Sequence, residues 1–331
     1  GYWATTPIEA NTTAIQNTAW SAFLNATSCL SGDTQAHFDC LRSLPSEQVK
    51  TAINSTDVAK GNWNPTVDGD IVQKDLQRSF LDGDFVKSAN LLVMANLDEG
   101  ISFGPKSINT TDDLRQALAG NGIGSIPKAE ARSQSAQDAV LQAYPEGEDA
   151  YPPYHAGDGL LMSGKMDRRS AGIFGDLVML GPKRAVAQAL SANQTGGAQV
   201  YNARFEQVPY PGFIISGTPH FIEVPYVFKN PLDTQNPLGD KPRDLALAEE
   251  MASYWRSFVV TGNPSTLKCD SCPEWPAYSS SDRQMMTLSK AYNGRNNTVV
   301  TDDDRVAGMQ MLADIRSGAY QPAQKRGHSE L

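Results

Sequence analysis

The sequence predicts an α/β protein, because apolar segments that suit buried strands alternate with segments of helical spacing. Residues 91–95 are all apolar, as in a parallel strand that is buried on both faces. Residues 199–205 alternate between apolar and polar side chains and suit a second strand. Residues 243–261 carry the strongest helical stripe, which Pro242 opens and Gly262 closes. Strands interleaved with helices are typical of the α/β class.

Further helices are expected where apolar side chains recur three or four residues apart. In the second of them, residues 34–43, this spacing places Phe38 and Leu41 on the inner face. A break is expected at Gly181 and Pro182, inside a longer helical segment, because proline lacks the N–H that a helix interior needs. The expected helical segments are 11–24, 34–43, about 45–53, about 71–83, 111–145, 167–192 and 302–315.

The charge and apolar pattern of the chain argue against several classes of protein. The 331 residues carry 28 Lys and Arg against 37 Asp and Glu, which gives a net charge of −9 at pH 7. An acidic surface repels phosphate backbones and anionic lipid, so we expect no nucleic-acid partner. No apolar run reaches the ~18 residues of a transmembrane segment. The chain opens on Gly1 without a basic-then-apolar leader, and we expect a processed form or a fragment.

The four cysteines allow three pairings, and the sequence does not choose among them. Cys29 and Cys40 flank a short polar loop that a local bridge would close. Cys269 and Cys272 form a CxxC motif, which is compatible with half a zinc site, a redox-active pair or a small surface disulfide. The disulfide is favoured, because no histidine lies near the motif and the motif follows a helix. We therefore expect two local bridges and no metal site.

Candidate glycosylation sites and the paired cysteines together favour the secretory pathway. None of the N-x-[ST] sequons has proline in its middle position. The C-terminal His328-Ser329-Glu330-Leu331 resembles the H-D-E-L retrieval signal of the endoplasmic reticulum, with serine in place of aspartate. Retention there is one expectation, and an ordinary disordered tail over residues 321–331 is the other. The sequon asparagines are Asn11, Asn25, Asn54, Asn109, Asn193 and Asn296.

Two kinds of chemically active side chain follow the predicted strands. Asp98 and Glu99 come just after the strand at 91–95, and His220 lies on a loop after the second strand. Ligands of open parallel sheets bind beyond the carboxyl ends of the strands. A carboxylate and a histidine at that edge suit a hydrolase, in which the carboxylate orients the imidazole and the imidazole deprotonates a nucleophile. Separately, Glu99 is equally compatible with a solvated or capping carboxylate, and His220 with a structural histidine.

One candidate nucleophile lies within the chain. Gly100-Ile101-Ser102-Phe103-Gly104 fits the G-x-S-x-G pattern of a nucleophile elbow, and Asp176 and His220 would follow it in the order serine, acid, histidine. However, six residues, 96–101, separate the predicted strand from Ser102, whereas an elbow serine follows its strand directly. The pattern is also short enough to arise by chance, so Ser102 is the weaker hypothesis.

Several short segments are specific as a set, although each of them alone is not. Residues 96–100 read Asn-Leu-Asp-Glu-Gly, and residues 217–228 begin Gly-Thr-Pro-His. With the shorter segments they resemble the type-B carboxylesterases, a group that includes cholinesterases and fungal lipases, and the fungal secreted esterases most of all. The matches follow the family's order from about residue 1 to residue 320. The shorter segments are 29–42, 65–69, 254–258, 261–264 and 275–278.

The resemblance implies an α/β-hydrolase fold and a serine esterase or lipase. It makes Glu99 the acid and His220 the base of the triad, with Glu223 as a supporting carboxylate. The family's nucleophile lies in a G-E-S-x-G motif upstream of the part that matches Gly1, and its oxyanion-hole glycines lie further upstream. We therefore expect residues 1–320 to form the C-terminal part of a carboxylesterase domain, without the N-terminal strands and the nucleophile elbow.

Three further expectations follow from the resemblance. The chain would be inactive alone and would need the N-terminal part of the same enzyme as its partner, since Ser102 falls within the acid motif. The substrate would be an uncharged small-molecule or lipid ester, because Phe213, Ile214 and Ile215 offer an apolar pocket wall. No cofactor is implied. The alternative is a non-catalytic cholinesterase-like relic or binding module, against which the retained Glu99 and His220 argue.

Overall fold

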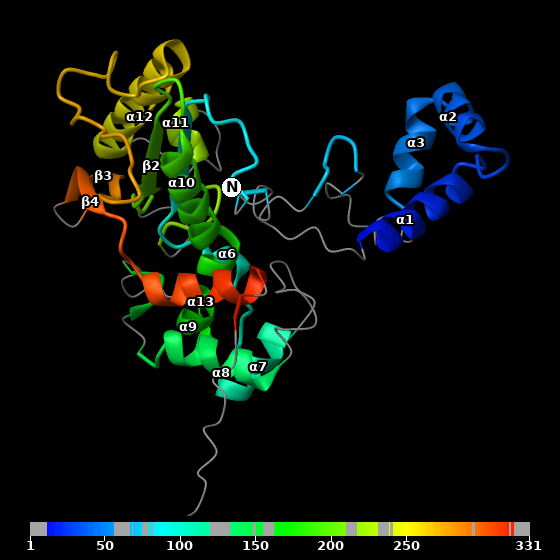
Figure 1. The fold of residues 1–331 in the computed structure, drawn as a ribbon, viewed down its shortest axis with the longest axis horizontal. Coiled ribbons are helices and arrows are strands. Elements are labelled where there is room, and N and C mark those ends of the chain that lie inside the picture. The colour runs from blue at the N-terminus through cyan, green and yellow to red at the C-terminus, as the bar shows by residue number, and fades with distance from the viewer. Residues whose placement is uncertain are drawn as a thin grey trace, which may run out of the picture. The chain divides into compact units, whose positions relative to one another are not determined.

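The computed structural model divides the chain into two compact units, Pro7–Leu76 and Gln77–Leu331 with Gly1–Thr6 (Figure 1). Nothing in the composition marks that boundary, and the single domain expected over residues 1–320 stays a prediction. The structure describes residues 12–55, 67, 69–74, 79–80, 82–119, 133–147, 150–154, 162–209, 217–230, 238, 241–292, 295–317 and 319–320.

The smaller unit contains three helices, α1 (Thr12–Ala26), α2 (Thr34–Ser43) and α3 (Ser46–Ile53), close to the expected ranges. Their core is small and centres on Phe23 and Ala52. Cys29 is bonded to Cys40, as expected, and this bridge ties the end of α1 to α2. The inward orientation expected of Phe38 is wrong, because its side chain is 43% exposed and lies against the ring of Trp20.

The larger unit is built on a mixed sheet with the strand order β1-β2-β3-β4 among the described residues. Strands β1 (Leu91–Asn96), β2 (Val200–Phe205) and β3 (Gln284–Tyr292) are parallel to one another, and β4 (Arg295–Thr301) returns antiparallel to β3. The two predicted strands are confirmed. The β3–β4 hairpin was not predicted, although Asn293-Gly294 between its strands is a strong hairpin signal.

Helices cover both faces of this sheet (Figure 1). Leu91 and Val93 pack with α10 (Gly181–Asn193) on one face. The alternate residues of β1, Leu92 and Met94, pack on the other face with α11 (Val224–Phe228) and α12 (Pro242–Thr261). This alternation is what a strand buried on two sides requires. The observed layers are those of the α/β class.

A further apolar cluster joins helices beyond those that cover the sheet. Its buried side chains come from α7 (Thr111–Ala119), α8 (Gln134–Ala143), α9 (Asp167–Gly175) and α13 (Val306–Ser317). The long helix expected over 111–145 is described as α7 and α8, with residues 120–132 outside the described ranges. Of the helix expected over about 71–83, residues 71–74 are not helical and residues 79–80 are.

The helical path from α9 to α10 does not break at Gly181 and Pro182, contrary to expectation. A π-helical turn, Asp176–Leu180, joins the two helices. Pro182 then stands in the first turn of α10, where a residue without a backbone N–H is tolerated. Gly181 suits this junction, because a Cβ at that position would approach the carbonyl oxygen of Asp176 to 2.6 Å.

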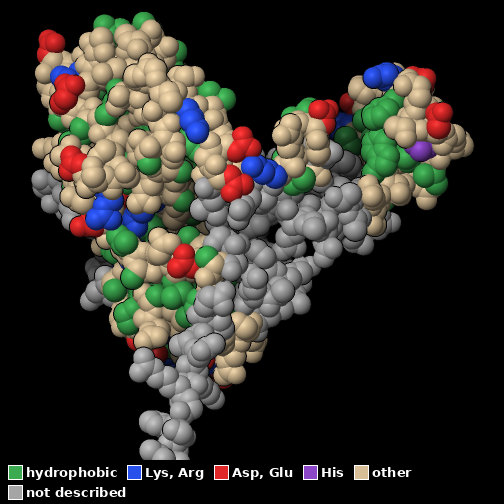
Figure 2. Space-filling model, in the orientation of Figure 1, with side chains coloured by type: hydrophobic (Ala, Val, Ile, Leu, Met, Phe, Trp, Pro, Cys, Tyr) green, Lys and Arg blue, Asp and Glu red, His purple; other side chains and the backbone are tan. Residues whose placement is uncertain are grey.

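Two surface features bear on the classes of partner considered above. Acidic and basic side chains are interspersed over the described residues on the face in Figure 2, without an extended basic patch there. In the part of the chain that the structure describes, none of the helices has both the length and the apolar character of a membrane-crossing segment.

Candidate active site

Glu99 lies in the turn that follows β1, at the carboxyl edge of the parallel strands. Its side chain is buried, and Oε1 accepts a hydrogen bond of 2.8 Å from the backbone N–H of Asn96. The short helix α6 (Gly100–Phe103) begins immediately afterwards. Gly100 is required here, because a Cβ would overlap the carbonyl group of Ala171 in α9. Packing against α9 therefore fixes the turn that presents the Glu99 carboxylate.

His220 meets this carboxylate from a loop after β2. Its Nδ1 lies 2.7 Å from Oε2 of Glu99, a hydrogen bond between residues 121 positions apart in the sequence. The hydrogen bond to Glu99 is the first cause that raises the pKa of His220, while partial burial opposes it. The ring of Phe103 lies 4.9 Å away between centroids, and the His220 side chain stays 38% exposed. Nδ1 is thus engaged with Glu99.

Asp98 fixes the loop that carries His220. Its buried Oδ2 accepts hydrogen bonds from the backbone N–H of Thr218, at 2.7 Å, and from the Thr218 hydroxyl, at 3.1 Å. Gly217 has a φ of +76°, and a Cβ on it would overlap the same carboxylate. The loop conformation three residues before His220 therefore depends on a glycine packed against a buried carboxylate.

Asn96 makes a second connection to this loop. Its Nδ2 donates to the carbonyl of Pro219, at 2.7 Å, and to Oε2 of Glu223, at 2.6 Å. Burial is the largest cause that raises the pKa of Glu223. Glu223 thus binds Asn96 while the imidazole binds Glu99. The residues on both sides of His220 are held from the end of β1.

The sequence of this chain matches a family of known proteins. The model of the Carboxylesterase family matches residues 4–305. The chain belongs to the carboxylesterase family. It is 27% identical to acetylcholinesterase 1 of Caenorhabditis briggsae over 253 residues, which are 71% of this chain and 38% of that protein. It is 24% identical to secreted lipase 4 of Gibberella zeae over 255 residues, which are 77% of this chain and 41% of that protein.

The solved structures agree on the fold of this carboxylesterase chain. Aspergillus niger EstA superposes with a TM-score of 0.65 at 19% identity, covering 96% of this chain and 56% of EstA. The chain therefore has the α/β-hydrolase fold in part, as the sequence predicts. It spans about two fifths of the length of the curated relatives just named.

The other candidate triad is not assembled in this chain. Ser102 lies in α6 with an exposed side chain, and no hydrogen bond joins its hydroxyl to His220 within the described residues. Asp176 is buried at the start of the π-helical turn. Its carboxylate accepts from Tyr144, at 2.8 Å, and from two nitrogens of Arg305, at 2.7 Å each. These bonds assign Asp176 to the helical core instead of the imidazole.

The structure describes some of the remaining candidate residues and leaves others outside the described ranges. The pocket wall of Phe213, Ile214 and Ile215 lies outside the described residues, as do Asn11 and the C-terminal tail with its retrieval-like signal. The side chains of the other sequon asparagines are exposed, which leaves them accessible to modification: Asn25, Asn54, Asn109, Asn193 and Asn296.

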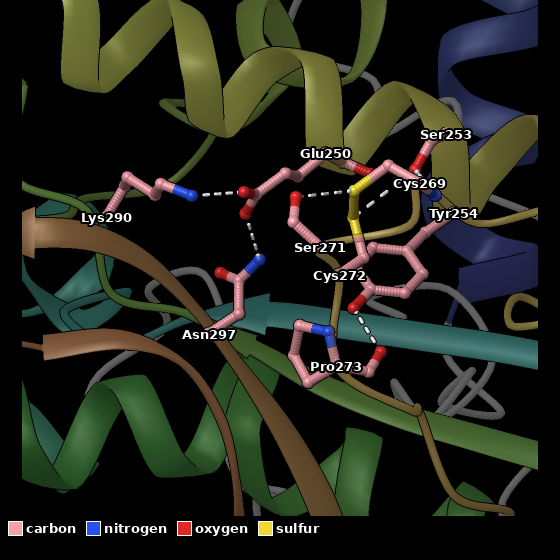
Figure 3. The surroundings of a disulfide bond; sticks show 9 residues. All are labelled: Glu250, Ser253, Tyr254, Cys269, Ser271, Cys272, Pro273, Lys290 and Asn297. Carbon is pink, nitrogen blue, oxygen red and sulfur yellow. Dashed lines mark hydrogen bonds and ion pairs between the residues drawn. A yellow bond between two sulfur atoms is a disulfide. The ribbon is translucent and has the colours of Figure 1, made fainter.

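The CxxC pair forms a disulfide beside α12, as expected (Figure 3). Its two sulfurs and a carboxylate oxygen of Glu250 lie within 4.8 Å of one another, the spacing of a metal-ligand set. The sulfurs of Cys269 and Cys272 are bonded to each other and are not thiolates. Glu250 also pairs with Lys290 and accepts a hydrogen bond of 2.7 Å from Asn297. A structural role for this cluster follows from these contacts.

The sequence points to Asp98 beside Glu99, but it does not reveal which residues position the site. Asn96, Asp98 and Thr218 stand within three residues of Glu99 or His220, but nothing in their types or spacing distinguishes them from ordinary loop residues. Their proximity to Glu99 and His220 is the signal that was available. A buried carboxylate next to a candidate catalytic carboxylate is a reason to look for backbone donors that it holds.

Proposed function

We propose that this chain supplies the acid and the base of a serine-type carboxylic ester hydrolase. The observation that carries the proposal is the 2.7 Å contact between Nδ1 of His220 and Oε2 of Glu99 at the carboxyl edge of the sheet. Membership of the carboxylesterase family supports the same reaction. Glu99 and His220 together are called the dyad below.

In the proposed reaction, neutral His220 carries its proton on Nδ1 and donates it in a hydrogen bond to Glu99. Nε2 is then the acceptor that takes the proton of a serine hydroxyl as its oxygen attacks the ester carbonyl. The imidazolium gives that proton to the departing alcohol when the ester bond breaks. A water molecule repeats the sequence on the acyl-enzyme and releases the acid. Buried Glu99 stabilises the imidazolium throughout.

The serine nucleophile and the oxyanion donors are proposed to come from the N-terminal part of the same enzyme. The basis is the motif resemblance, in which both lie upstream of the matched region. Without an activated nucleophile and preorganised donors, acyl transfer loses its covalent route and much of its transition-state stabilisation. The dyad alone would therefore not turn over esters. A non-catalytic binding module is the alternative, and the assembled dyad argues against it.

The substrate class and the compartment are also proposals. An uncharged small-molecule or lipid ester fits the apolar residues 213–215, and the names of the cholinesterase and lipase relatives fit an ester substrate in general. The secretory pathway fits two disulfides and the exposed sequon asparagines. Retention in the endoplasmic reticulum through His328–Leu331 rests on the sequence alone.

The test is hydrolysis of p-nitrophenyl butyrate and labelling by a fluorophosphonate probe. The 331-residue chain alone should show neither, and both should appear once the N-terminal part is present, with the label on that part. In the assembled enzyme, His220→Ala should lower kcat by at least about 10³-fold. Ser102→Ala is the matched control and should change nothing. Labelling of Ser102 in the chain alone, abolished by His220→Ala, would overturn the proposal.

A further inference from the structure

A cavity of about 290 Å³ lies at the start of α9, outside the dyad. We propose that it binds a small organic carboxylate. The proposal does not depend on ester hydrolysis, because none of the lining residues belongs to the dyad or its supporting loop. The lining residues are Asn109, Glu146, Gly147, Lys165, Met166, Arg168 and Arg169.

Arg169 is the fixed donor of this site. Its side chain is only 8% exposed. Nε donates to the carbonyl of Tyr144, at 2.7 Å, and Nη2 donates to the carbonyl of Leu141, at 2.8 Å, so two bonds to the end of α8 hold the guanidinium plane. Nη1 is buried without a hydrogen-bond partner among the described residues. A buried charged donor without a hydrogen-bond acceptor is costly. A ligand carboxylate would satisfy it by displacing the Glu146 carboxylate, which lies 3.6 Å from Nη1.

The charges around the cavity favour an anion. Among the lining residues that the structure describes, three cations, Lys165, Arg168 and Arg169, accompany one carboxylate, Glu146. Arg168 donates to the carbonyls of Tyr151 and Pro153, so it contributes its charge from a fixed position. Lys165 is exposed and can reach toward an occupant. The start of α9 adds the positive end of a helix dipole.

Asp167 and Glu146 are acidic groups near the site that could oppose the binding of an anion. Asp167 directs its oxygens to the backbone N–H groups of Ile108, at 2.7 Å, and Gly164, at 2.8 Å, so both oxygens already have donors. Glu146 approaches Nη1 of Arg169 to 3.6 Å but is 71% exposed. This is an ion pair without a hydrogen bond, and Glu146 can turn into solvent. Glu146 is therefore a competitor for the position that a ligand carboxylate would take.

The size and lining of the cavity decide the kind of anion. A volume of about 290 Å³ is close to the lower end of small-molecule pockets and exceeds what a bare ion needs. The side chain of Met166 offers an apolar, adaptable surface for an organic body. Guanidinium and ammonium groups together suit a carboxylate head. An organic acid with a short aliphatic or aromatic body fits both requirements.

The test is calorimetric titration of the full chain, made in bacteria so that Asn109 carries no glycan. The probes are sodium butyrate, sodium benzoate, butyramide and inorganic phosphate. Butyrate and benzoate should bind and butyramide should not. In chain labelled at its methionine methyl groups, benzoate should shift the Met166 signal, which Met166→Leu identifies.

Variants of the lining residues make the test specific. Glu146→Gln should tighten benzoate binding by about two- to fivefold, because it removes the competitor, and Lys165→Gln should weaken it by a similar factor. Arg169→Lys should abolish binding if circular dichroism shows a folded chain. Arg256→Gln, an exposed cation on α12, is the matched control and should have no effect.

Three results would overturn the proposal. The first is no heat with either carboxylate at about 10 mM, well above a millimolar Kd. The second is binding that Glu146→Gln and Lys165→Gln leave unchanged, since these exposed positions can be altered without loss of the fold. The third is binding of phosphate without the carboxylates, which would indicate a bare-oxyanion site instead.

Discussion

Asp98 and Thr218 are joined by three hydrogen bonds, two to the Asp98 carboxylate and one from the Asp98 backbone N–H to the Thr218 carbonyl. These bonds connect the turn of Glu99 to the loop of His220, because Asp98 directly precedes Glu99 and Thr218 stands two residues before His220. The 2.7 Å dyad contact is therefore not the only link between the two loops. A buried side chain outside the proposed chemistry holds the proposed acid and base in register.

Replacing Asp98 by asparagine should loosen the His220 loop. Oδ2 accepts from the backbone N–H of Thr218 and Oδ1 from that of Tyr154. The asparagine amide puts an NH2 donor in the place of one of these oxygens, so at least one of the two N–H groups loses its acceptor. We expect a loss of about 1–3 kcal/mol in the free energy of unfolding, measured with urea. The pKa of His220, followed by NMR, should also fall toward its ordinary value. Thr218→Val is the milder control, because it removes the hydroxyl alone and should cost about 1 kcal/mol.

Replacing Gly217 by alanine should disturb the same loop by packing. The new Cβ would overlap the Asp98 carboxylate and lie 2.8 Å from Cβ of Pro153, in a residue with φ of +76°. Strain and overlap together should lower the free energy of unfolding by about 2–5 kcal/mol. Gly196→Ala is the matched control, because Gly196 has φ of +66° with nothing within 4 Å of a Cβ. It should cost about 1–2 kcal/mol, and equal losses would contradict the packing argument.

The dyad should make stability depend on pH in a defined direction. The pKa of His220 is raised in the folded chain, chiefly by the hydrogen bond to Glu99, so folding favours the protonated imidazole. This contribution is complete below the unfolded pKa of about 6.5 and is lost as pH rises through the raised folded value. Glu99→Gln should therefore cost more stability at about pH 5.5 than at about pH 9.

Two measurements check this prediction. Urea unfolding of the chain and of Glu99→Gln at both pH values gives the difference in stability. NMR titration of His220 gives its pKa directly, which should be lower in Glu99→Gln. Glu223→Gln is the comparison variant, since Glu223 binds Asn96 and contributes to the His220 pKa only through its charge. An unchanged His220 pKa in Glu99→Gln would contradict the assigned contact.

The Cys29–Cys40 bridge should stabilise the smaller unit. It closes a loop with a sequence separation of 11, for which the loop-entropy model gives about 3 kcal/mol. Replacing both cysteines by alanine should raise hydrogen exchange in peptides from α1–α3 before any change in the sheet. The Cys269–Cys272 pair, with a separation of 3, is the comparison and should stabilise less by the same model. A larger effect from the second pair would contradict this account.

The sequence by itself determined the elements whose signals are local. The all-apolar run of β1 and the stripe of α12, ended by Gly262, specify their elements through neighbours one to four residues apart. Cys29 with Cys40 and Cys269 with Cys272 are close enough in the chain for a local bridge to be the natural expectation. The dyad was predicted from the resemblance of its motifs to those of a family, since Glu99 and His220 alone fit structural roles equally well.

Only the tertiary structure decided the contacts that join distant segments. The bonds of Asp98 to Thr218 and of Asn96 to Glu223 span more than a hundred residues, and neither pair leaves a periodic pattern in the chain. The same holds for the buried guanidinium of Arg169, whose plane is set by carbonyls at the end of another helix. Phe38 was misplaced because helical spacing identifies a face but not the neighbour that will cover it. Which buried polar group meets which donor is settled by packing, because each must find its partner among groups that the fold brings together.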